Sequence, residues 1–299
     1  KEASFLVENA VRAQQNQEVM DLYLNSAVIA IAEQIETDIF GLTLNAQTNL
    51  GVLGTPLTGA SLRSARNQLN KQKAPVRQRY AVLSPDDATT ALGDSSLIQF
   101  FANARPEAVA RGAMGDIYGF ETYMSQFTPL GAKVALGGAT GGTFTLTYRG
   151  QTTAGQAYNV SAATLKTALE GLSTVGAGNV EVTAITGGFE IYMKGALAGS
   201  HDQITGSVAS LTGATNPAIT DVNWNPAFNR GAYMLAMRAM PEPEPASGVR
   251  ATVMRDPDSG LVVRVLYGYN MSYLGHQVTV DVLYGVKTIR AAKAINVKS

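Results

Sequence analysis

Cysteine is absent from this 299-residue chain, and histidine occurs only twice, as His201 and His276. Without thiols, the chain cannot form disulfides, use a thiolate nucleophile or bind zinc through sulfur. Two imidazoles are also too few for a multi-histidine metal centre. The sequence contains neither a run of the roughly 18 apolar residues that a membrane-spanning helix needs nor the charged-then-apolar pattern of a secretion signal.

Neither sign of charge is in excess, because 23 Lys and Arg balance 23 Asp and Glu. A neutral chain has no net electrostatic attraction for nucleic acid or for anionic lipid. The apolar fraction of 45% is that of a globular protein, and the length is sufficient to bury a substantial core. The first residue is Lys1 rather than Met, so we expect a processed product or part of a longer one.

Between Gln17 and Leu42, apolar residues recur at steps of three and four, which predicts one long amphipathic helix. A helix of this length typically lies across a sheet or against a neighbouring subunit. The Thr/Asn/Gly-rich stretch Thr43–Gly59 is typical of a loop. A second helix is expected over Gly59–Lys73, followed by a short strand over Arg77–Leu83.

The sequence Ser-Pro-Asp-Asp at 84–87 predicts a helix start, with Ser84 as the cap and Pro85 at the first helical position. Short helices are expected over Asp87–Arg111, and an extended segment over Gly112–Pro129. Alternation of helices and strands indicates a mixed fold, which we assign to the α+β class.

The composition changes at about Leu130, and from there to Val222 the chain is rich in Gly, Ala and Thr and poor in charge. Its predicted elements are strands at Thr143–Tyr148 and Gln151–Val160, a helix opened by Ser161 with Leu165, Leu169 and Leu172 on one face, and strands at Val180–Ile185 and Phe189–Met193. The pairs Gly137-Gly138 and Gly141-Gly142 suggest a flexible junction at the first strand. We interpret this β-β-α-β-β unit as a small inserted α+β domain.

After the only tryptophan, Trp224, the segment Pro226–Met240 is expected to be helical. The proline-rich segment Pro241–Pro245 is expected to be a stiff, exposed connector. Two apolar segments follow, Leu261–Tyr267 and Val278–Tyr284. Each of them runs into the same tetrapeptide, Val-Leu-Tyr-Gly. This likeness predicts two similar strands that lie side by side.

Side chains with catalytic potential are few, and their settings favour structural roles. The pair Asp86-Asp87 would lie in the first turn of a helix, where the helix dipole favours acids. Asp256 and Asp258 belong to a Pro-Asp-Ser-Gly turn, where Asp makes local hydrogen bonds.

The adjacent residues His201 and Asp202 offer a general base and its orienting group, but no nucleophile is evident near them. His276 follows Gly275 and is expected at the surface of a turn. No phosphate-binding glycine motif follows a predicted strand. We therefore predict that the chain is not an enzyme and has no catalytic, cofactor-binding or metal site.

The most uneven charge lies between residues 63 and 79, where six cations occur without an acid: Arg63, Arg66, Lys71, Lys73, Arg77 and Arg79. One interpretation is a solvated basic face on a surface helix. The other is a contact with an acidic neighbour, which would be another subunit, a scaffold protein or packaged DNA. No aromatic residue interrupts the segment, so stacking on single-stranded nucleic acid is not expected.

Several stretches, taken in order, resemble a known family: Arg79–Pro85 (Arg-Tyr-Ala-Val-Leu-Ser-Pro), Arg111-Gly112 with Gly115–Phe120, Asn225–Ala239, Asp281–Arg290 and Ala294–Val297. They resemble the major capsid (coat) proteins of tailed bacteriophages, in particular those like the coat protein of Salmonella phage P twenty-two, which have the Hong Kong phage ninety-seven capsid fold. The resemblance covers roughly two-thirds of the chain, outside the inserted segment.

The resemblance implies a spine helix, a peripheral domain, an axial domain and an insertion. The implied segments are 1–74 for the spine helix and the first part of the peripheral domain, 75–130 for the first part of the axial domain, 131–222 for the insert, 223–270 for the second part of the axial domain, and 271–299 for the closing strands of the peripheral domain. The closing strands are expected to pack against the spine helix.

The resemblance also implies a function. Pentamers and hexamers of such a protein self-assemble in the host cytoplasm into the icosahedral shell of the virion, which encloses double-stranded DNA. The implied partners are other copies, a scaffolding protein, the portal, and DNA that is held weakly and without sequence specificity; no cofactor and no membrane are implied. Two alternatives remain open, namely an encapsulin-type shell around protein cargo and a phage tail or decoration protein.

Overall fold

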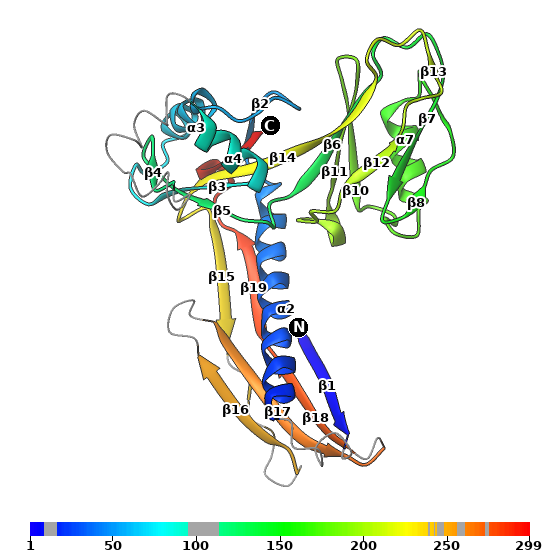
Figure 1. The fold of residues 1–299 in the computed structure, drawn as a ribbon. Coiled ribbons are helices and arrows are strands. Elements are labelled where there is room, and N and C mark those ends of the chain that lie inside the picture. The colour runs from blue at the N-terminus through cyan, green and yellow to red at the C-terminus, as the bar shows by residue number, and fades with distance from the viewer. Residues whose placement is uncertain are drawn as a thin grey trace. The chain divides into compact units, whose positions relative to one another are not determined.

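A computed structural model describes residues 1–8, 17–94, 114–238, 240–241, 243, 248–255, 261–272 and 275–299 (Figure 1). Contacts along the chain separate two compact units. The small unit is formed by Lys1–Glu36 and Met234–Lys287, and the large unit by Thr37–Tyr233 and Thr288–Ser299. Both helices and strands are present, so the predicted α+β class is confirmed.

The small unit contains a four-stranded antiparallel sheet in the order β1-β18-β17-β16. The strands are β1 (Glu2–Glu8), β16 (Arg250–Arg255), β17 (Val262–Asn270) and β18 (Gly275–Asp281). Tyr267 lies opposite Val278, so the two predicted neighbouring strands are confirmed. The second of them ends at Asp281, and a separate strand, β19 (Leu283–Thr288), pairs with β15 (Tyr233–Arg238).

Helix α2 (Gln17–Thr43) has the predicted bounds to within one residue (Figure 1). Its apolar positions Ile31 and Ile35 are each 4% exposed, as the three-and-four spacing requires. The ring of Tyr23 lies 5.5 Å from that of Phe5 on β1, which joins this helix to the sheet of the small unit. The boundary between the two units falls within α2, after Glu36.

The large unit is built on a nine-stranded sheet with the main order β10-β11-β6-β14-β3-β5-β4, to which β20 and β2 add beside β14. The strands outside the inserted segment are β2 (Thr48–Gly51), β3 (Arg79–Leu83), β4 (Asp116–Ile117), β5 (Phe120–Met124), β14 (Ala218–Asn229) and β20 (Ala294–Lys298). The helices that accompany them are α3 (Gly59–Lys71) and α4 (Pro85–Gly93).

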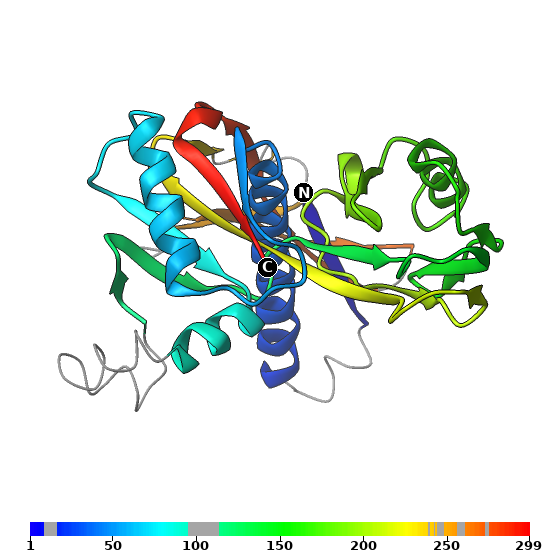
Figure 2. The ribbon, with the colours of Figure 1, turned by 90° about the horizontal axis from the view of Figure 1, so that it is seen from above.

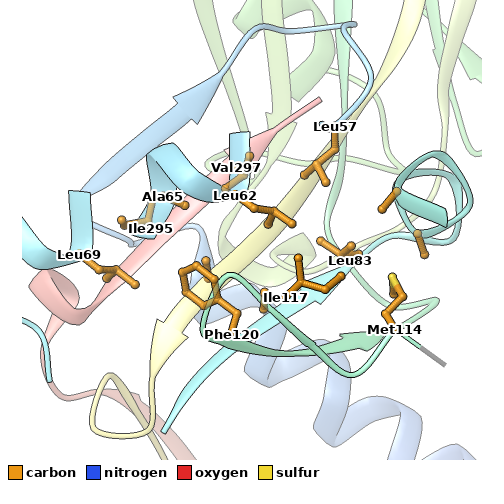
Figure 3. Packing of buried hydrophobic residues seen from close by; sticks show 14 of the residues in the cluster. Leu57, Leu62, Ala65, Leu69, Leu83, Met114, Ile117, Phe120, Ile295 and Val297 are labelled. Carbon is orange, nitrogen blue, oxygen red and sulfur yellow. The ribbon is translucent and has the colours of Figure 1, made fainter. Parts of the chain in front are cut away.

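One buried cluster packs between α3, α4 and this part of the sheet (Figure 3). Leu62, Ala65 and Leu69 form the inward face of α3 and are at most 1% exposed. The predicted start of α4 is confirmed, because the Ser84 hydroxyl accepts a hydrogen bond from the backbone N–H of Asp87 and Pro85 is the first helical residue. The other helices expected up to Arg111 lie largely outside the described residues.

The segment predicted to be an insert has its own buried cluster. Its strands and helix are β6 (Leu130–Ala135), β7 (Gly141–Tyr148), β8 (Gln151–Thr152), β9 (Gln156–Ala157), α7 (Ala162–Glu170), β10 (Val180–Ile185), β11 (Gly188–Met193), β12 (Ile204–Ser207) and β13 (Leu211–Thr212). The predicted strands at β7, β10 and β11 and the helix α7 are present. The predicted strand Gln151–Val160 is instead two short strands, β8 and β9, and α7 ends at Glu170, before Leu172. The structure adds β6, β12 and β13. A short 3₁₀ turn, η1 (Gly195–Leu197), follows β11.

Strand β14 links the insert to the rest of the large unit. Its first half pairs with β6, from Ala218 opposite Ala135 to Asn223 opposite Leu130. Its second half pairs with β20 and β3, where Ala227 lies opposite Ile295 and Ala81. Figure 2 shows this one strand running from the insert into the central sheet beside β20.

The predictions for two longer segments are wrong. The segment Pro226–Met240 is not helical, because its described residues form the end of β14 and all of β15. The segment Thr43–Gly59 is not only a loop, since β2 pairs in parallel with β20 inside it. In both places, pairing with strands distant in sequence decides the backbone conformation, and local composition does not report it.

Candidate functional site: subunit contact surfaces

Asp87 is a buried acceptor rather than simply an acid at a helix start. It is 2% exposed, and its carboxylate accepts hydrogen bonds from the backbone N–H of Leu57 (3.2 Å), the Ser84 hydroxyl (3.0 Å), the Asn225 amide (2.6 Å) and the Ser299 hydroxyl (2.5 Å). The neighbouring Asp86 is exposed. Asp87 therefore ties α4 to the loop before α3, to β14 and to the last residue, which is a structural role.

The adjacent residues His201 and Asp202 have different partners. Asp202 pairs with Arg149, and hydrogen bonds from Arg149 and Ser200 hold the pKa of this carboxyl below its ordinary value although burial alone would raise it. His201 instead packs edge-on against Phe127, with ring centroids 5.2 Å apart. These two side chains thus do not form a base and its orienting group.

The prediction that His276 lies at a surface turn is wrong. This residue lies within β18 and is half-buried. Its ring stacks on Tyr267 at 4.9 Å and meets Tyr269 edge-on at 5.2 Å. Asp256 and Asp258 lie outside the described residues. Over the described ranges, no group of three or more His, Asp or Glu side chains could hold a metal ion, and no helix is long and apolar enough to cross a membrane.

The basic segment divides into one buried and five exposed cations. Arg79 is 3% exposed, and its guanidinium donates to the carbonyls of Ala74 (2.7 Å) and Pro75 (2.8 Å) and to the Asn70 side chain (2.8 Å). It therefore fastens the end of α3 and is not part of the surface. The exposed members are Arg63, Arg66, Lys71, Lys73 and Arg77, which we call the basic strip.

The small unit leaves much of its apolar surface uncovered. Of the fifteen large apolar side chains exposed among the described residues, ten belong to this unit, although it contains less than a third of the chain. They are Leu6, Tyr23, Ile29, Met234, Leu235, Val253, Met254, Tyr269, Met271 and Leu283. Neither of the two buried clusters described above includes a small-unit residue. These exposed apolar side chains are candidates for contact with another protein.

The sheet of the small unit also has an open edge. Strand β16 pairs with β17 on one side, and no strand in the described part of the chain pairs with its other side. Five of its six residues are exposed, including Val253 (39%) and Met254 (53%). An unpaired, partly apolar edge is a template for contact with another chain.

An ion pair joins the insert to the closing strand of the large unit. Lys298 on β20 pairs with Glu190 on β11, and their side chains are only 12% and 9% exposed. The Lys298 ammonium also lies 4.1 Å from the ring centroid of Trp224, which in turn contacts the ring of Tyr192 at 5.0 Å. Trp224 is 1% exposed, so this junction is largely removed from water.

The insert carries a second, more exposed cluster, in which Glu181 accepts hydrogen bonds from Lys194 and from Lys166 (3.2 Å). The bond from Lys194 lowers the pKa of Glu181, against the opposing effect of burial. The pKa of Glu181 is therefore lower in the folded state than in the unfolded state. The cluster stabilises the fold fully at pH values above the unfolded-state pKa of Glu181. This stabilisation is lost as the pH falls through the folded-state pKa.

We expect Glu181→Gln to lower the free energy of unfolding by less than about 1 kcal/mol, because the carboxylate remains partly exposed. The difference between wild type and variant should be largest above the ordinary pKa range of glutamate and should shrink as the pH falls below it. Urea titrations at several pH values would measure it. A difference that grows as the pH falls would contradict this assignment.

These elements together form the α+β fold of phage capsid proteins, as the resemblance predicted. The cyanophage P-SCSP1u capsid structure matches with a TM-score of 0.51 at 12% identity, covering 99% of this chain and 71% of that chain. The acidic stable capsid structure of Helicobacter pylori bacteriophage KHP30 matches with a TM-score of 0.50 at 11% identity, covering 100% and 74%. By sequence, no family and no curated protein matches.

Proposed function

We propose that this chain is the major capsid protein of a tailed bacteriophage and self-assembles into the icosahedral shell that encloses its double-stranded DNA. The observation that carries the proposal is the likeness to phage capsid structures over nearly the whole chain. The uncovered apolar surface and the open β16 edge of the small unit support it, because a shell subunit must bury such surfaces against its neighbours. In this proposal the protein has no catalytic role.

The proposal includes an assignment of domains. Helix α2 is the spine helix, residues 75–130 begin the axial domain, and 131–222 are the insert. The strands β16 to β18 share the small unit with the first part of α2, which favours a boundary after Tyr233 within the predicted segment 223–270. We therefore give residues 234–287 to the peripheral domain and residues 223–233 to the axial domain.

In the virion, the proposed partners are other copies in pentamers and hexamers, a scaffolding protein and the portal during assembly in the host cytoplasm, and DNA without sequence specificity. The balanced charge of the chain supports weak rather than tight contact with DNA.

Electron microscopy of the purified protein tests the function directly. We expect closed icosahedral particles, and particles from infected cells should contain DNA. Particles filled with a protein cargo would indicate an encapsulin-type compartment. Rings or trimers that never close would indicate a tail or decoration protein, and either result would overturn the proposal.

A further inference from the structure

Residues 195–200, which contain η1 and which we call the η1 segment, lie directly against the last turns of α2. A Cβ atom built on Gly199 would come within 2.2 Å of the Thr37 carbonyl oxygen, so a side chain has no room there. Gly199 also has a φ of +80°, which favours glycine. A Cβ atom built on Gly41 of α2 would lie 3.0 Å from the carbonyl oxygen of Ala198, which is closer than an ordinary contact. Glycine on each side thus lets the two backbones touch.

The η1 segment is also fixed to the rest of the insert. The backbone N–H of Ala196 donates a hydrogen bond to the Asn179 side chain (2.9 Å). Ser200 is buried, and its hydroxyl lies 2.9 Å from the Tyr148 hydroxyl and donates to the Asp202 carboxylate (2.9 Å). Tyr148 belongs to the buried cluster of the insert. The η1 segment therefore couples the end of α2 to the core of the insert.

Two further contacts join the insert to other parts of its own chain. The Lys133 ammonium on β6 donates a hydrogen bond to the carbonyl of Leu53 (2.9 Å), in the loop after β2. The buried ion pair between Glu190 and Lys298 holds β20. Together with the η1 segment, these contacts attach the insert to α2, to the loop after β2 and to β20. The turns of α2 that the insert contacts, from Thr37 onward, are those that belong to the large unit.

The outer surface of the insert consists of small, uncharged residues. All of residues 131–222 are described, and apart from Arg149 and His201 each exposed one is Gly, Ala, Ser, Thr, Asn or Gln. Arg149 is paired with Asp202, and His201 packs on Phe127. The fifteen large apolar side chains exposed in the described part of the chain all lie outside this range. Binding energy between proteins is concentrated in large side chains such as Trp, Tyr and Arg, so this surface offers a partner few anchors.

We infer that the insert is a brace within its own chain, which holds the last turns of α2 and the strand β20, and that it makes no contact between copies. The first part stands on the hydrogen bonds, the ion pair and the glycine contacts of the insert. The second part rests on the proposed function, since it concerns the copies of a shell. It assigns the contacts between copies to the rest of the chain, where large apolar side chains are exposed.

A pair of glycine substitutions tests the brace. Alanine normally stabilises a helix relative to glycine, and at Gly93 of α4 no atom of another described element lies within 4 Å of the added Cβ. Gly93→Ala should therefore not raise the equilibrium constant of unfolding in urea, followed by the fluorescence of Trp224. Gly41→Ala should raise it about fivefold, because the new methyl group meets the backbone of Ala198. A Gly41→Ala protein as stable as wild type would overturn the brace.

Hydrogen exchange shows whether the two sides of the contact are coupled. In Gly41→Ala we expect faster exchange both in residues 37–43 and in the η1 segment, and in each of them a larger change than in β3. Faster exchange in residues 37–43 alone would show that the η1 segment does not hold α2, and would overturn the brace as well.

Thiol reactivity tests the outer surface. Because the chain has no cysteine, Thr167→Cys, Thr183→Cys and Thr212→Cys each place a unique thiol at an exposed position, on α7, β10 and β13 respectively. The comparison is Met254→Cys on β16, where the native side chain is 53% exposed. On assembly, the rate of reaction with a small maleimide should change less than about twofold at the three insert positions and fall at least about tenfold at position 254.

Electron microscopy of the same samples separates the inference from the proposed function. A tenfold slower reaction at any insert position in closed shells would overturn the inference and leave the function intact. Rings or trimers with unchanged reactivity of the insert would sink the function and support the inference. If the chain forms no assembly, the function fails, and Gly41→Ala still decides whether the insert braces its own chain.

Discussion

Replacing Asp87 by alanine is expected to lower the free energy of unfolding of the large unit by about 3 to 5 kcal/mol. The substitution removes a buried carboxylate and leaves the donors of Leu57, Ser84, Asn225 and Ser299 without their acceptor. Each buried donor that loses its partner costs about 1 to 3 kcal/mol, and the donors can relax only in part. Denaturant titration followed by circular dichroism would measure the loss.

The adjacent Asp86 provides the matched control. It lies in the same first turn of α4, but it is exposed, so Asp86→Ala should cost less than about 1 kcal/mol. Asp87→Asn should recover only part of the loss, because its NH₂ group would face other donors. A variant Asp87→Ala as stable as Asp86→Ala would show that the Asp87 network contributes little to the fold.

The second large effect is expected at the junction between the insert and β20. Lys298→Met should cost about 3 to 5 kcal/mol, because it leaves the Glu190 carboxylate buried without a partner. Loss of the contact between the Lys298 ammonium and the Trp224 ring adds to this cost. Trp224 is the only tryptophan, so its fluorescence during urea titration reports unfolding at this junction.

The double variant Glu190→Gln with Lys298→Met should recover most of the loss, since no charge then remains buried. Lys194→Met provides the exposed comparison, because its pair with Glu181 has a lysine side chain that is 38% exposed, and it should cost less than about 1 kcal/mol. If the double variant were as unstable as Lys298→Met alone, packing around Trp224 rather than charge burial would be the cause.

Elements with strong local patterns could be predicted from the sequence. The spacing of apolar residues in α2, the strict alternation in β7, and the Ser-Pro start of α4 are each decided by neighbours within a few residues. The local composition of Pro226–Met240 permits a helix, and the sequence therefore predicts one there. Its strand conformation comes from pairing of β14 with β20, β3 and β6, which no local pattern reveals.

The role of Asp87 could be predicted only in part. The spacing of Ser84 and Asp87 indicated a helix cap, but the bonds from Asn225 and Ser299 join residues 138 and 212 positions apart. Arg79 is a similar case, because charge in the sequence cannot show whether a cation faces water or backbone carbonyls. The exposed apolar surface of the small unit cannot be predicted from the sequence for the same reason. The apolar residues of this surface follow the same strand and helix patterns as buried apolar residues. They differ only in that no other part of the folded unit packs over them.

The pairing of Leu130 with Asn223 bears on whether residues 131–222 could be removed as one unit. The insert leaves and re-enters through two residues that lie opposite each other on β6 and β14. Opposed residues of antiparallel strands are about 5 Å apart, a gap that a two-residue turn spans. A two-residue turn from Leu130 to Asn223 could therefore close the chain without residues 131–222, and the pairing of β14 with β3 and β20 would be left in place.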